Sequence, residues 1–112
     1  MVRFSLILLA ALLFSSGVRA QSAFDPMSVA YVLCVTSETK KLALVTPPVA
    51  KEVIIERAFG ACDDAEAQAR KSLAEKGVSG SVIDERIAQT KKFIRLTAPD
   101  DVDRFRVNAR PR

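Results

Sequence analysis

The stretch CVTSETKKLALVTPPVAKEVIIERAFGAC, residues 34–62, decides the fold of this chain. It begins and ends with the two cysteines of the sequence, and each stands 14 residues from Pro48. Adjacent prolines end a helix, because the residue before a proline avoids the helical region of backbone space. The spacing therefore predicts two helices folded back on each other at Pro47-Pro48. At about 1.5 Å per helical residue, a disulfide between Cys34 and Cys62 would join them roughly 21 Å from the turn.

The first 20 residues have the three parts of a secretory signal. Arg3 gives a short basic start, residues 4–14 are almost wholly apolar, and Val18 and Ala20 are small residues placed for cleavage before Gln21. The alternative is an uncleaved membrane anchor, but an apolar run of about 11 residues is too short to cross a bilayer as a helix, which takes about 20. We therefore expect residues 1–20 to be a signal peptide cleaved after Ala20, and the product to be periplasmic or secreted.

The cleaved product would have 92 residues, enough for one small domain. Two of the 17 basic residues and none of the 13 acidic ones lie in the signal, so the net charge falls from +4 to about +2. Much of the apparent basicity is lost, and we expect no nucleic-acid partner.

The two cysteines of an exported chain predict a disulfide. A metal site would need more ligands than two thiols, and the chain has no histidine. A reactive thiol would need a basic neighbour that lowers its pKa, and the sequence specifies none. We expect Cys34 and Cys62 to form a structural link, with no metal and no cofactor.

The first helix is predicted to begin at Asp25-Pro26, with aspartate as the cap and proline at the first helical position, and to end near Val45. A β-hairpin is the alternative, because residues 29–36 and 42–45 have the composition of strands. We favour the helix, since the cap signal is strong and an isolated hairpin is marginal. The expected inner face consists of Ala30, Leu33, Cys34, Ser37, Lys41 and Leu44.

A second helix is predicted from Val49 to the stop at Lys76-Gly77, with Gly60 as the point where it would bend. Its apolar stripe consists of Ile55, Ala58, Phe59, Cys62, Ala65, Ala69 and Leu73. A third helix is expected over residues 81–96, with Ile83, Ile87, Thr90 and Ile94 on its inner face. Ala98-Pro99 would then break it.

The predicted fold is thus an all-α domain over residues 21–97, in which a disulfide-linked antiparallel hairpin packs against a third helix. Residues 98–112 are predicted to be a disordered charged tail, because they hold few apolar residues. The tail contains four arginines that could contact an anionic surface, although three aspartates largely offset their charge. These arginines are Arg104, Arg106, Arg110 and Arg112.

Three acidic residues that follow Cys62 are a candidate catalytic site, namely Asp63, Asp64 and Glu66. Paired carboxylates do acid–base work only where burial separates their pKa values. Neighbouring side chains on a helix diverge by about 100°, so we interpret the cluster as a solvated face. Without histidine, Ser–His and Cys–His pairs are excluded. We expect a protein that is not an enzyme.

One set of positions carries a resemblance to a family, and it covers about residues 31–73. The set is Tyr31-x-x-Cys34, Lys41-Leu42-Ala43 and Ala58-Phe59-x-Ala61-Cys62, followed by Glu66, Arg70 and Leu73. In these positions the chain resembles small exported helical proteins of Gram-negative bacteria, mostly uncharacterised, that have two helices joined by one disulfide. The resemblance implies a periplasmic helical hairpin and brings no active site. The chain is also similar in scale to the acid-stress chaperones of the enterobacterial periplasm, but its cysteines are much closer together.

The function that we expect is therefore structural or protein-interacting, with an unknown envelope protein as partner. A periplasmic stress chaperone, or an inhibitor of an envelope enzyme, is the alternative. The tail could add a weak contact with a membrane surface.

Overall fold

The computed structural model describes residues 25–111 of the chain, and within this range the fold is all-α with no strand. The helices are α2 (Pro26–Ala43), α3 (Lys51–Ala61), α4 (Asp63–Glu75) and α5 (Gly80–Asn108). The predicted signal peptide and its cleavage site lie outside the described residues, as does Arg112.

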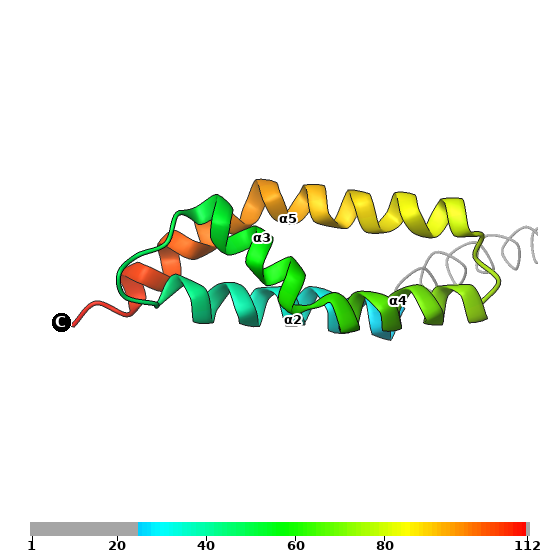
Figure 1. Ribbon diagram of the computed structural model, residues 1–112, viewed down its shortest axis with the longest axis horizontal. Helices are drawn as coiled ribbons and strands as arrows, with labels where there is room; N and C mark the ends of the chain where they lie inside the picture. The colour runs from blue at the N-terminus through cyan, green and yellow to red at the C-terminus, as the bar shows by residue number, and fades with distance from the viewer. Residues whose placement is uncertain (1–24, 112) are drawn as a thin grey trace, which may run out of the picture.

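The helices form three rods, namely α2, α3 with α4, and α5, and α3 is inclined to the others (Figure 1). The chain runs along α2, returns through α3 and α4, and then runs back along α5, so that α2 and α5 point in the same direction. Cys34 and Cys62 are joined by a disulfide with a Cα–Cα distance of 6.0 Å. The predicted disulfide-linked antiparallel hairpin is therefore confirmed.

The first helix starts where the sequence predicts. The Asp25 side chain accepts a hydrogen bond from the backbone N–H of Ser28 at 3.1 Å, and Pro26 follows at the first helical position. The β-hairpin alternative for residues 29–45 is wrong, because α2 is helical as far as Ala43.

The predicted inner face of this helix is wrong, apart from Cys34. The buried stripe of α2 recurs every four residues, whereas Leu33 is 63% exposed and the other predicted positions are exposed too. The stripe tolerates a threonine because the Thr39 hydroxyl donates to the Val35 carbonyl at 2.7 Å, which satisfies it inside the helix. Its members are Tyr31, Val35, Thr39 and Ala43.

The second predicted helix is two helices. The break lies at Cys62, whose backbone (φ −106°, ψ 20°) departs from helical values, and not at Gly60. Asp63 and Asp64 then stand in the first turn of α4, where negative charge is favourable. All members of the predicted apolar stripe are buried or half-buried, so that stripe is confirmed.

The turn after α4 is the predicted glycine stop. Gly77 has φ +83°, its N–H donates to Ala74 at 3.0 Å, and the Val78 N–H donates to Leu73 at 3.1 Å. This is a Schellman motif, which uses the left-handed conformation that glycine adopts without strain.

The prediction of a disordered tail is wrong for residues 98–108. Helix α5 continues through Pro99 to Asn108, and Figure 1 shows it bending in its orange part. Buried contacts outweigh the missing proline N–H, because Ala98 and Val102 continue the buried face that begins at Ile83. Val102 packs in a cluster with Ala43 and Ile54, which ties the end of α5 to both arms of the hairpin.

Candidate functional site

A groove lies between the parallel helices α2 and α5, with a volume of about 550 Å³. That size is within the range of protein binding pockets. Its α5 side extends from Arg86 to Phe105, a helical length of roughly 28 Å at the standard rise. The apolar side chains along it include Tyr31, Val32, Val35, Leu73, Ile87, Phe93, Ile94, Ala98 and Phe105.

The groove is apolar in spite of its threonines. Four threonines line the groove, and the hydroxyl of each donates to the backbone carbonyl four residues before it. Each hydroxyl is therefore already satisfied within its own helix. The bonds are Thr36 to Val32 at 2.9 Å, Thr39 to Val35 at 2.7 Å, Thr90 to Arg86 at 2.9 Å and Thr97 to Phe93 at 3.0 Å. The groove surface therefore favours the apolar groups of a bound molecule. Phe93, which lines the groove, is 65% exposed.

The charges along the groove are of opposite sign at its two ends. Arg86 lies toward the start of α5, and among the described residues it forms no ion pair. Asp101 lies toward the other end and pairs with Arg104, three residues along the same helix. The groove thus has a positively charged side chain toward one end and a negatively charged side chain toward the other.

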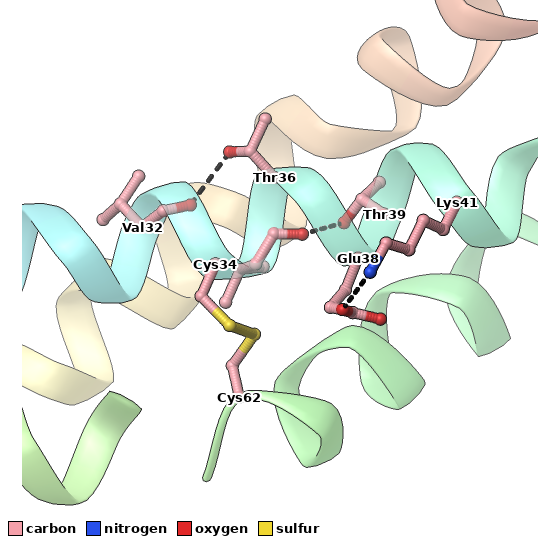
Figure 2. Close-up of a disulfide and its surroundings, with 8 residues drawn as sticks. Val32, Cys34, Thr36, Glu38, Thr39, Lys41 and Cys62 are labelled. Carbon is pink, nitrogen blue, oxygen red and sulfur yellow. Dashed lines mark hydrogen bonds and ion pairs between the residues drawn. A yellow bond between two sulfur atoms is a disulfide. The ribbon is translucent and has the colours of Figure 1, made fainter. Parts of the chain in front are cut away.

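The disulfide holds the opposite side of α2 (Figure 2). Cys34 comes from the middle of α2 and Cys62 from the junction of α3 and α4, and both cysteines pack in the central core cluster. Neither cysteine lines the groove. The link therefore fixes the hairpin without occupying the open face.

The predicted acidic cluster does not form one site. Asp63 and Asp64 are exposed, whereas Glu66 accepts ion pairs from Arg70 at 3.2 Å and Lys91 at 2.6 Å. Burial alone would raise the pKa of Glu66, but the hydrogen bonds from Lys91 and Arg70 outweigh it and the pKa is lowered. Glu66 is thus an ionised link between α4 and α5.

Tyr31 is a buried group that the predicted inner face of the first helix did not include. Its side chain is 1% exposed, and its hydroxyl has no hydrogen-bond partner among the described residues. Burial, with the nearby charges of Glu66 and Asp63, raises the pKa of Tyr31 to about 12. The hydroxyl therefore stays protonated.

The tail arginines that the structure describes do not form one cluster, because their side chains have different surroundings. Arg106 donates to the carbonyls of Ala43 at 3.0 Å and Val49 at 2.7 Å, which joins the end of α5 to the α2–α3 connection. Arg104 pairs with Asp101, Arg110 is exposed, and Arg112 lies outside the described residues. Arg106 is consequently not free for an anionic surface.

The comparisons with known proteins bring no relative. No family model, no curated protein and no solved structure matches the chain. Among the described residues, none of the helices has both the length and the apolar character needed to span a membrane.

Proposed function

We propose that this protein is a non-enzymatic interaction protein of the cell envelope, and that its α2/α5 groove receives an amphipathic helix. The groove is the observation that carries the proposal. It is long, apolar and lined by two helices, which is how helical ligands are bound by grooves in other interaction proteins.

The direction of the helices supports a helical guest. Since α2 and α5 run in the same direction, a guest that runs against both has its dipole antiparallel to theirs, which is the favourable arrangement. With α3 and α4 as the descending rod, the guest would complete an up-and-down arrangement of four rods. An exported location is consistent with the disulfide, which persists in oxidising compartments.

The test is site-specific photocrosslinking in the exported protein. A photoreactive residue at Phe93 should crosslink to a helical segment, mapped by mass spectrometry. The matched control is Leu33, which is 63% exposed against 65% for Phe93 but does not line the groove. Equal crosslinking from both positions, or none from Phe93, would contradict the proposal.

A chaperone is the second candidate, and exposed apolar residues of α2 outside the groove favour it. Met27, Val29 and Leu33 are 39%, 46% and 63% exposed. The two candidates differ in which variant should impair the function. Leu33→Asp should weaken the suppression of client aggregation, whereas Phe93→Asp should weaken helix docking.

A further inference from the structure

We infer that the helix received by the groove is α5 of a second copy of this chain, so that two copies pair through the α2/α5 face. The inference rests on the proposed function in one respect, namely that the groove takes a helix. The further inference adds which helix the groove takes.

Five of the groove residues of α5 form a pattern that reads almost the same in both directions. Arg86, Thr90, Phe93, Thr97 and Asp101 follow one another at steps of four, three, four and four residues, which keeps them near one face of the helix. If two copies of α5 pack antiparallel about the point between residues 93 and 94, Arg86 lies opposite the partner's Asp101. Thr90 then lies opposite the partner's Thr97.

The middle of this face supplies the apolar contact. Phe93 is 65% exposed, although it lies in the middle of α5. Burying large apolar side chains is the main favourable contribution in protein association. In the antiparallel pairing the two copies of Phe93 would stand next to the twofold axis and cover each other.

The ends of the face supply complementary charge. Arg86 has no ion-pair partner among residues 25–111, and the Asp101–Arg104 pair is an i,i+3 surface pair, a kind that contributes little to stability. Asp101 is therefore available to a second cation. Twofold symmetry creates the Arg86–Asp101 contact twice, since each copy contributes both residues.

The helix directions agree with the same symmetry. A twofold axis across α5 makes the two copies of α5 antiparallel. Each then also runs against the partner's α2, because α2 and α5 of one chain are parallel.

The test is a charge exchange followed by sedimentation equilibrium of the exported protein. Arg86→Asp and Asp101→Arg should each raise the dissociation constant of the dimer by on the order of tenfold, because each puts like charges opposite one another twice. The double variant Arg86→Asp/Asp101→Arg should restore it to within about threefold of the original. Phe93→Asp should leave a monomer, and Leu33→Asp should leave the dimer intact.

The outcomes separate this inference from the proposed function. A protein that is monomeric at high micromolar concentration, or a double variant that fails to recover, would overturn the pairing. If crosslinking from Phe93 still reaches a helix of a different protein, the groove function stands and only the second copy is wrong. Circular dichroism of each variant checks that the helices are retained.

Discussion

The carboxylate of Asp25, which caps the start of α2, pairs with the ammonium of Lys76, which ends α4. The same carboxylate accepts hydrogen bonds from Ser72 Oγ at 2.6 Å and from the Ser28 N–H at 3.1 Å. One side chain thus satisfies the first turn of α2 and fastens the far end of α4 to it.

Asp25→Ala should lower the free energy of unfolding by about 1–2 kcal/mol, since it removes a helix cap together with the link to α4. Urea unfolding at neutral pH measures the loss. Asp100→Ala is the matched control, because Asp100 is exposed and forms no ion pair among the described residues, and its effect should stay within about 0.5 kcal/mol. Equal losses in the two variants would show that Asp25 has no special role.

The contribution of Asp25 should depend on pH. Hydrogen bonds from Lys76 and Ser72 hold its pKa at about 2, below the ordinary value. An aspartate in the unfolded chain titrates near pH 3.9, so the folded state binds the proton less readily. The stabilisation is therefore complete above about pH 5 and is lost as the pH falls toward about 2. The stability difference between the natural protein and Asp25→Ala should shrink over that range, and a constant difference would argue against this linkage.

Reduction of the Cys34–Cys62 disulfide should lower the free energy of unfolding by about 3–4 kcal/mol. In the chain-entropy description this is the effect of closing a loop in the unfolded chain between two cysteines 28 positions apart. Chemical unfolding with and without reductant gives the value. The variant Cys34→Ser/Cys62→Ser should unfold similarly in both buffers. Labelling of free thiols in the native exported protein would contradict the presence of the link.

Tyr31→Phe should leave the protein as stable or make it more stable, by up to about 1 kcal/mol. The substitution removes a buried hydroxyl that has no hydrogen-bond partner among the described residues, and it keeps the ring in the core. Thermal unfolding measures the change. Thr39→Val is the comparison variant. It also removes a buried hydroxyl, but one that donates a hydrogen bond to the Val35 carbonyl. A marked loss of stability in Tyr31→Phe would mean that the hydroxyl does have a partner.

Arg106→Ala should cost about 1.5–3 kcal/mol, since it removes charge-assisted hydrogen bonds to two backbone carbonyls. Arg104→Ala removes only an exposed pair within one helix and should cost less than about 1 kcal/mol. Both variants lose the same charge, so a difference between them reports the bonds to Ala43 and Val49. Indistinguishable unfolding curves would refute the anchoring role.

The hairpin was predictable because its determinants are local. Asp25-Pro26 begins α2, Gly77 ends the second arm, and the cysteines stand in register about the prolines. The face of α2 was not predictable in the same way. Its apolar residues lie all around the helix, and its true stripe contains a threonine whose hydroxyl is satisfied by its own backbone.

The end of α5 and the groove could not be predicted from neighbouring residues in the sequence. The rule about prolines considers only neighbouring residues, whereas α5 is continued by buried contacts of Val102 with Ala43 and Ile54 and by the two bonds of Arg106. The groove likewise combines residues of α2 and α5 that are 47 to 77 positions apart in the sequence. The repeated bond from threonine to the fourth preceding carbonyl is the one local signal on both of its walls.

The position of Cys62 has a consequence for hydrogen exchange. Because the cysteine stands at the junction of α3 and α4, the disulfide lies within neither of these helices, and each of them has its own ion pair at its outer end. Lys51 pairs with Asp103 at 2.7 Å at the start of α3, and Asp25 pairs with Lys76 at the end of α4. We expect the amides of α3 and α4 to lose protection as two separate cooperative units, with the slowest exchange next to the cystine.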